Sequence, residues 1–329
     1  MMNQNLRYQR QIQLARVGQL GQIRLQQARV LVVGAGGLSA SLLPLLAASG
    51  LGKIRLYDAD RVELHNLHRQ ILFRMADLGT FKVNAAKQHL LELNPECDVE
   101  VYAETLNNRN IEYACQDVDV VVDAADRFSL TYLLSDYCYE HNLAFISASV
   151  LAEQGYVAGF CGGRAPSYRA VFPHPPTHAH SCQSSGVMPS TVATIASLQA
   201  HMVTNVILQQ QPSALGQMLS IDLAQWHTQQ FRFDDAREPS DPLLWLAPNQ
   251  LLNDDILIEL RSADECPTSI HPHIQRMSIA DLQAASFHPN WPTTRRIVCI
   301  CQTGIRAYQA VQILKSHGYA SFAICAAHT

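Results

Sequence analysis

Residues 28–70, ARVLVVGAGGLSASLLPLLAASGLGKIRLYDADRVELHNLHRQ, contain the pattern that decides the fold. The unbroken apolar run from Val30 to Val33 is typical of a strand that is buried on both faces of a parallel sheet. Three glycines follow within four residues, and then a helix-length segment, Leu38 to Ser49, and a second strand, Ile54 to Tyr57. This order predicts the nucleotide-binding half of a doubly wound α/β fold, a mostly parallel Rossmann-like sheet with helices on both faces.

The glycine turn and an acidic residue indicate how a nucleotide is bound. Gly34, Gly36 and Gly37 allow a tight turn, and they let phosphate approach the backbone N–H groups at a helix N-terminus. Asp58 follows the second strand, where a carboxylate can accept hydrogen bonds from ribose hydroxyls. Ser39 replaces the third glycine of the dinucleotide fingerprint, which weakens a prediction of NAD. The pattern alone therefore predicts an adenine nucleotide without saying which one.

Length, charge and cysteine usage bound the protein class. A chain of 329 residues is long enough for one large domain and a small one. The net charge of −4 and the pI near 6.4 argue against nucleic-acid binding. No stretch reaches about 18 consecutive apolar residues, so we expect no membrane span. The polar N-terminus lacks a signal core, and nine cysteines follow no disulfide framework. We expect a cytoplasmic protein.

The residues after Asp58 are more specific than the glycine turn. The run D-A-D-R-V leads to N-L-H-R-Q at residues 66–70, a cluster for which a dehydrogenase has no use. This run resembles the MoeB/ThiF/HesA adenylyltransferases of molybdopterin and thiamine biosynthesis, which are bacterial relatives of the ubiquitin-activating enzymes. The resemblance covers residues 1–235. Its further motifs, in the family's order and spacing, are Arg7-Tyr8-Gln9-Arg10-Gln11, Lys82 in T-F-K-V, Asp126 in D-A-A-D, and Cys182 in C-Q-S-S-G-V-M-P.

The resemblance implies an activity and a partner. Such enzymes use ATP to adenylate the C-terminal glycine carboxylate of a small ubiquitin-like sulfur carrier protein ending in Gly-Gly, and they release pyrophosphate. It implies that Arg69 and Lys82 bring positive charge to the triphosphate and that Asp126 holds Mg²⁺. It implies that Arg10 reaches the phosphates of the neighbouring subunit in a homodimer. The other nucleotide-site residues that it implies are Asp58, Asp60, Asn66, Gln70 and the glycine turn.

Some of these residues can also be explained without any functional role. Arg10 can lie on a solvated helix face, and Asp126 can be an ordinary residue of a strand-end turn. Cys182 matches a crossover-loop cysteine that in some family members forms a covalent link to the carrier, but it can also be a plain loop thiol. The histidines of residues 174–180, HPPTHAH, suit a solvated loop better than a metal site, because prolines interrupt their spacing.

The C-terminal part has its own motif. We expect a linker at 236–250 and a small α/β domain at 251–329. The sequence C-x-x-G-x-R at residues 301–306 lies between a strand and a helix and resembles the active loop of rhodanese-like sulfurtransferases. N–H donors at a helix N-terminus and a nearby arginine stabilise a thiolate, or a persulfide, on Cys301. The tail is short, and Glu259 and Ala307 replace residues usual in such domains. A working sulfurtransfer loop and a degenerate docking domain are both open.

Two family features are missing. The structural zinc of the family uses two C-x-x-C pairs, but this chain has Ser167 and Ala170 at the first pair and no cysteine between Cys182 and Cys266. We therefore expect no structural zinc. Arg127 replaces the family's asparagine after the magnesium aspartate, which puts in doubt how that loop holds metal or carrier tail.

The order of elements along the large domain can also be predicted. We expect Gly18 and Gly21 to break the N-terminal helices, and Ser129 to cap a helix that ends at His141. The remaining elements expected are a helix at 81–93, strands at 99–102, 118–122 and 144–149, two strands within 155–172, a helix ending near Leu208, and a strand pair at 217–223 and 229–233.

Three functions compete with adenylation followed by sulfur transfer. A nicotinamide-dependent oxidoreductase would use the glycine turn but leave Arg69, Lys82 and Asp126 without a role. The second competing function is adenylation alone, with the tail as a docking domain. The third is a non-catalytic scaffold with the same fold. Sulfur transfer would need a persulfide donor such as a cysteine desulfurase, with Cys182 or Cys301 as the thiol. The sequence does not name the carrier or its pathway.

Overall fold

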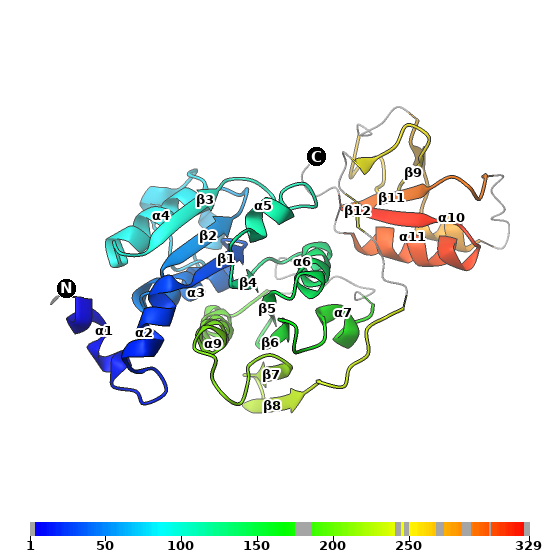
Figure 1. The fold of residues 1–329 in the computed structure, drawn as a ribbon. Coiled ribbons are helices and arrows are strands. Elements are labelled where there is room, and N and C mark those ends of the chain that lie inside the picture. Colours follow the sequence, from blue (N-terminus) through cyan, green and yellow to red (C-terminus); the bar gives the residue numbers. More distant parts are fainter. Residues whose placement is uncertain are drawn as a thin grey trace.

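The computed structural model describes residues 4–174, 186–240, 245–246, 250–267, 273–284, 291–302 and 304–325. These residues form two units, each built around its own sheet (Figure 1). The larger unit has eight strands in the order β3-β2-β1-β4-β5-β6-β7-β8, and the C-terminal unit has four in the order β10-β9-β11-β12. Among the described residues no helix is long and apolar enough to cross a membrane.

The large sheet is doubly wound over its first five strands and antiparallel beyond them. Its parallel strands are β1 (Arg29–Val33), β2 (Lys53–Tyr57), β3 (Asp98–Tyr102), β4 (Val120–Asp123) and β5 (Ala144–Leu151). Its antiparallel strands are β6 (Gln154–Cys161), β7 (Gln217–Asp222) and β8 (His227–Arg232). The predicted mostly parallel Rossmann-like fold is confirmed.

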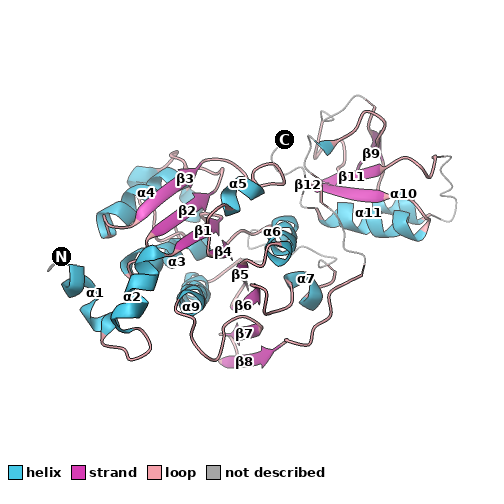
Figure 2. Ribbon diagram, in the orientation of Figure 1, coloured by secondary structure: helices cyan, strands magenta, loops and turns pink. Residues whose placement is uncertain are grey.

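Helices cover both faces of this sheet, as Figure 2 shows. Val30 and Val32 point into one core cluster, whereas Leu31 and Val33 point into the other, so β1 is buried on both faces. The first face is covered by α3 (Gly37–Ala48), α4 (Lys82–Leu93) and α9 (Pro189–Ile207). The second face is covered by α5 (Ile111–Cys115), α6 (Phe128–Glu140) and α7 (Tyr168–Val171). The N-terminal helices are α1 (Gln4–Ile12) and α2 (Gly18–Gln27).

Three local predictions were wrong. Helix α2 runs through Gly21, which is a close-approach position, since a Cβ there would lie 2.9 Å from Leu208 Cδ2. Only one strand forms within 155–172, because Gly162 and Gly163 both take positive φ and turn the chain into α7. Ser129 does not cap α6, which begins one residue earlier with Arg127 at the N-cap.

The C-terminal unit is a small parallel α/β layer. Its strands are β9 (Ile256–Glu259), β10 (Gln275–Arg276), β11 (Ile297–Cys301) and β12 (Ser321–Cys325), all paired in parallel. Its helices are α10 (Ile279–Gln283) and α11 (Ile305–Ser316). The predicted strand before Cys301 and the predicted helix after it are confirmed as β11 and α11, whereas β10, β12 and α10 were not foreseen.

Candidate active site

The site lies where the strand order of the large sheet reverses, between β1 and β4. Gly34 ends β1 with φ +98°, and a Cβ at this position would lie 2.7 Å from the carbonyl oxygen of Ala124. Only glycine fits here, because both the conformation and the space exclude a side chain. The turn after β1 therefore packs directly against the loop after β4, at the carboxyl edge where open α/β sheets bind ligands.

Hydrogen bonds fix the glycine turn before any ligand binds. The backbone nitrogen of Ala35 donates to Asp58 Oδ2 (2.6 Å), and that of Asp60 donates to Asp58 Oδ1 (2.7 Å). The hydroxyl of Ser39, which replaces the third fingerprint glycine, donates to the Gly34 carbonyl. Burial raises the pKa of Asp58, and the charge of Lys82 partly opposes this rise. Asp58 thus connects the glycine turn to the end of β2, and its role at a ribose stays a prediction.

The N-L-H-R-Q run lies against the same turn. A Cβ added at Gly36 would lie 3.9 Å from Gln70 Nε2, and one added at Gly37 would lie 3.7 Å from Arg69 Cγ. Arg69 Nη2 donates to Asn66 Oδ1 (3.1 Å), which orients the guanidinium. Gln70 Oε1 is buried and has no hydrogen-bond partner among the described residues. A buried polar atom without a partner beside a glycine turn is expected where a polar ligand completes the site.

Lys82 begins α4 and reaches back to the segment after β2. Its Nζ lies 2.8 Å from Asp60 Oδ2, and its backbone nitrogen donates to the Asp60 carbonyl (2.9 Å). The lysine side chain is 6% exposed and the aspartate side chain 55%. Asp60 is thus the partner of Lys82 in the ligand-free state, a pairing that the sequence did not predict.

Two aspartates, one at the end of β4 and one in the loop after it, have different environments. Asp123 is buried, and it accepts hydrogen bonds from the Thr131 hydroxyl (2.7 Å) and the Ser147 hydroxyl (3.0 Å). Burial raises the pKa of Asp123 to about 6. Asp126 is exposed, and its carboxylate makes no hydrogen bond or ion pair to any described residue. Asp123 therefore holds the loop, and Asp126 is the carboxylate available to a ligand.

The donor set suits Mg²⁺ carried by a nucleotide. Among the described residues no group of three or more His, Cys, Asp or Glu side chains could hold a metal. Mg²⁺ binds through one or two carboxylates plus substrate phosphates and water, so the single carboxylate of Asp126 fits this mode. A site built from protein side chains alone does not fit the described part of the chain.

The structure describes only some of the remaining residues that the sequence predicted for the site. Arg10 lies exposed at the last turn of α1, where its guanidinium pairs with no described acidic group. The predicted role of Arg10 at a neighbouring subunit stays a prediction. Cys182 and the histidines at 178 and 180 lie outside the described residues.

The segment at the expected zinc position is held by other chemistry. Ser167 donates from its backbone nitrogen (2.7 Å) and from its hydroxyl (2.6 Å) to the two carboxylate oxygens of Glu238. Arg169 forms a two-point ion pair with Asp136 (2.9 and 2.6 Å). These side chains offer no thiolate and do not fit a structural zinc. The first contact joins the start of α7 to the chain after β8, and the second joins α7 to α6.

Cys301 ends β11 and is fully buried beneath the N-terminus of α11. Its Sγ accepts the N–H groups of Gly304 (3.1 Å) and Ala307 (3.3 Å), which stabilise negative charge on sulfur. Gly304 takes φ +88° at the N-cap of α11. Arg306 forms a two-point ion pair with Glu265 (2.8 Å each). The loop thus has the geometry expected of a cradle for an anionic sulfur.

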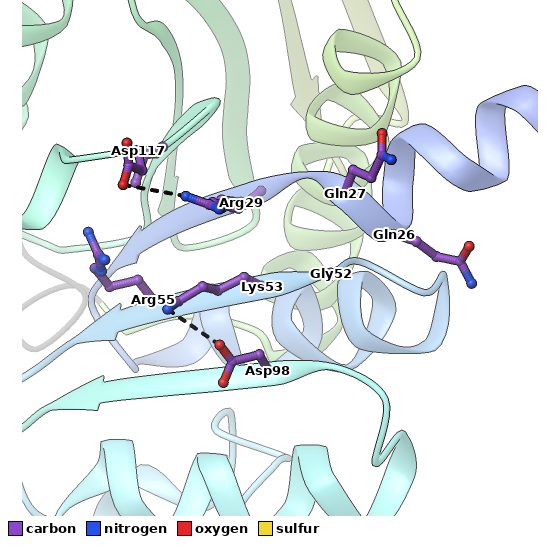
Figure 3. A pocket seen from close by; sticks show the side chains of 10 residues that line it. Gln26, Gln27, Arg29, Gly52, Lys53, Arg55, Asp98 and Asp117 are labelled. Atoms are coloured by element: carbon purple, nitrogen blue, oxygen red, sulfur yellow. Dashed lines mark ion pairs between the residues drawn. The ribbon is translucent and has the colours of Figure 1, made fainter.

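A pocket elsewhere on the large unit does not belong to this site. It has a volume of about 590 Å³ and lies at the amino ends of β1 to β3, the edge opposite the glycine turn. Figure 3 shows its basic side chains paired with acidic ones, Arg29 with Asp117 (3.5 Å) and Lys53 with Asp98 (3.3 Å). Because these charges are already matched, the pocket offers little to an ionic ligand.

Comparison with known proteins decides the family. Residues 8–243 match the ThiF family. The chain belongs to the ThiF family. The relatives named "Adenylyltransferase and sulfurtransferase MOCS3" include that of Drosophila ananassae, 38% identical over 218 residues, which covers 66% of this chain and 48% of the relative. That of Drosophila sechellia is 32% identical over 283 residues, 84% of this chain and 62% of the relative. This ThiF-family chain thus spans about half to three-fifths of these relatives.

Solved structures agree with the fold. The chain resembles the E. coli MccB complex with MccA-N7isoASN, with a TM-score of 0.63, 24% identity, and 71% and 73% of the two chains covered. It resembles PaaA with a TM-score of 0.61, 22% identity, and 70% and 74% covered. At this identity the likeness establishes the ThiF-type fold alone.

Proposed function

We propose that this ThiF-family chain uses ATP to adenylate the C-terminal glycine carboxylate of a small ubiquitin-like sulfur carrier and then supports sulfur transfer to it. The observation that carries the proposal is the contact of Gly34 with Ala124, where a Cβ would lie 2.7 Å from the carbonyl oxygen. This contact brings the loop of Asp126 to the glycine turn, which already packs against Arg69 and Gln70. The relatives' name, adenylyltransferase and sulfurtransferase, supports the same chemistry.

In the proposed first step, the carrier carboxylate attacks the α-phosphate of ATP in line with the leaving pyrophosphate. Negative charge builds on the phosphoryl oxygens, so fixed cations lower the barrier. Arg69 and Lys82 supply this charge, and Lys82 can exchange Asp60 for a phosphate oxygen. Mg²⁺ supplies further positive charge to the phosphates when it is bound, and Asp126 is the side chain that would hold it. In a homodimer, Arg10 adds a cation from the partner subunit.

In the proposed second step, a persulfide on Cys301 attacks the carbonyl carbon of the acyl adenylate through its terminal sulfur. The bond from this carbon to the AMP oxygen breaks, and AMP leaves with the electron pair. The product is an acyl disulfide between the carrier and Cys301. A thiol reductant then attacks the Cys301 sulfur, and the thiocarboxylate of the carrier leaves with the S–S electron pair. A partner that forms persulfides, such as a cysteine desulfurase, would load Cys301.

Mass spectrometry of the carrier tests the whole proposal. A carrier ending in Gly-Gly is incubated with the protein, ATP, Mg²⁺, inorganic polysulfide and dithiothreitol. The proposal expects the mass change of one oxygen replaced by sulfur, lost in Asp126→Ala and in Cys301→Ser. Adenylation that persists without any thiocarboxylate would favour the alternative in which the C-terminal unit only docks. Cys301 is completely buried, and this observation supports the docking alternative.

A further inference from the structure

The segment between the two units is organised around Trp245. This tryptophan packs against the core cluster of the larger unit that contains α6 and also against the core of the C-terminal unit. Its backbone pairs in parallel with Ala323, which extends the C-terminal sheet beside β12. Its backbone oxygen accepts a hydrogen bond from the side chain of Asn108, in the loop before α5. Trp245 therefore contacts both units from within the segment expected to be a linker.

The loop that carries Cys301 faces the larger unit. A Cβ at Gly304 would lie 2.8 Å from the ring of Trp245 and 3.1 Å from Ser129 Cβ. Ser129 is in the first turn of α6, three residues after Asp126, and Gly304 donates its N–H to Cys301 Sγ (3.1 Å). A chain of direct contacts thus runs from the sulfur to the helix that follows the proposed magnesium loop. Figure 1 shows the C-terminal unit on the α5 and α6 side of the larger unit.

A second contact supports this orientation. Tyr308, in the first turn of α11, shares a hydrogen bond of 2.5 Å with His174 Nδ1 on the larger unit. Because Tyr308 lies at the start of α11, this hydrogen bond shows that α11 approaches the larger unit with its N-terminal end. We call Asn108, Ser129 and His174 the docking face. Its amide donates to the Trp245 backbone oxygen, its small serine side chain lies against Gly304, and its imidazole hydrogen-bonds to Tyr308.

We propose that the docking face receives the Cys301 loop of its own chain, and that Trp245 is the positioning residue that holds the loop there. This inference rests on the proposed function for its consequence: Cys301 works on the acyl adenylate formed in the same chain. Cys301 is fully buried in the docked state, and Gly304, which donates to its sulfur, is covered by Trp245 and Ser129. Opening of this contact should therefore make the thiol more reactive toward outside reagents.

The first test is the alkylation rate of Cys301 by iodoacetamide in the full-length protein, followed by tandem mass spectrometry of the peptide at 297–306. Trp245→Ala removes the partly buried ring that packs against both units, and loss of about 1.4 kcal/mol of packing raises the open population about tenfold. The alkylation rate should rise by about that factor. Trp245→Phe keeps an aromatic ring and should restore most of the protection. Equal rates in the wild type and Trp245→Ala would overturn the docking proposal.

The matched control is Trp291→Ala in the same unit. Trp291 packs against the C-terminal core and lies edge-on to Tyr319, with ring centroids 6.0 Å apart, and it is not part of either core cluster of the larger unit. Truncating it removes a ring of the same size without touching the docking face. If Trp291→Ala opens Cys301 as strongly as Trp245→Ala, the effect reports general loosening of the unit, and the positioning role is rejected.

The second test asks which chain supplies the sulfur. Asp126→Ala, which blocks adenylation, and Cys301→Ser, which blocks sulfur transfer, are co-expressed and copurified, then supplied with a Gly-Gly carrier, ATP, polysulfide and dithiothreitol. Transfer within one chain predicts no thiocarboxylate beyond that of the separate variants. Recovery of thiocarboxylate would show transfer between chains and overturn the inference. Pyrophosphate exchange by Cys301→Ser is the check on the proposed function, because its absence would refute adenylation and leave the alkylation result standing.

Discussion

Lys82 Nζ lies 2.8 Å from Asp60 Oδ2, so the cation expected at the triphosphate is held by an exposed carboxylate when no nucleotide is bound. The backbone bond from Lys82 to the Asp60 carbonyl fixes where α4 begins relative to the end of β2. Desolvating a lysine without a partner is costly, and the aspartate offsets that cost. Phosphate oxygens can then replace the carboxylate without moving the helix.

Replacing Lys82 should affect chemistry more than stability. Lys82→Met removes one fixed cation from the transition state, so the rate of adenylation should fall by about 10²- to 10³-fold. Lys87→Met is the matched control on the same helix, because Lys87 is partly exposed and lies beyond the site. The measurement is initial-rate pyrophosphate release. An unchanged rate in Lys82→Met would remove Lys82 from the proposed site.

Gly34→Ala should damage both the fold and the nucleotide site. The left-handed conformation and a Cβ only 2.7 Å from the Ala124 oxygen are both unfavourable, and together they should cost about 2–4 kcal/mol of the free energy of unfolding. Gly318→Ala is the control, since Gly318 also has positive φ but no atom lies within 4 Å of its Cβ position. Chemical denaturation and ATP titration of both variants check this. ATP affinity that survives in Gly34→Ala would contradict the role of the turn.

The buried carboxyl of Asp123 predicts a pH dependence of stability. Its pKa is raised to about 6, above its value in the unfolded chain, so its contribution is fully present below about pH 4 and is lost as the pH rises through 6. The free energy of unfolding of the wild type relative to Asp123→Asn should therefore fall by up to about 3 kcal/mol between pH 4 and pH 7. Denaturation of both proteins across this range checks the sign. A difference that stays constant with pH would show that Asp123 does not titrate in this way.

The contact between Ser167 and Glu238 should link α7 to the chain after β8 without a structural zinc. Glu238→Ala leaves the buried Ser167 without its acceptor and should lower the free energy of unfolding by about 1–3 kcal/mol. Asp235→Ala, a nearby exposed acid, should change it by less than about 0.5 kcal/mol. EDTA should leave the unfolding midpoint of the wild type unchanged. A midpoint that falls with EDTA and returns with zinc would contradict this account.

The parts of the site that lie close together in sequence were predictable. Gly34 to Gly37, Asp58 and the run at 66–70 sit within one strand–helix–strand unit, whose geometry is fixed by backbone rules. The family resemblance added Lys82 and Asp126, and the match of residues 8–243 to the ThiF family confirms that resemblance. The roles of the individual site residues, the homodimer and the cytoplasmic location stay predictions.

The contacts that depend on tertiary packing were not predictable. Lys82 and Asp60 are 22 residues apart, and the contact of Gly34 with Ala124 requires the strand order of the folded sheet. Trp245 lies in a segment whose charges and prolines indicate a linker, and composition alone says nothing about which surfaces such a ring contacts. Ser129 was expected at a helix cap, yet its side chain lies against Gly304 of the other unit.

The most direct test of the central claim is ATP–pyrophosphate exchange with the purified full-length protein. Candidate carriers ending in Gly-Gly are added one at a time, each beside a version that lacks the two glycines. The account predicts exchange that depends on an intact Gly-Gly tail and disappears in Asp126→Ala. ATP binding without exchange, for every intact carrier tested, would contradict adenylation and favour a non-catalytic scaffold with the same fold.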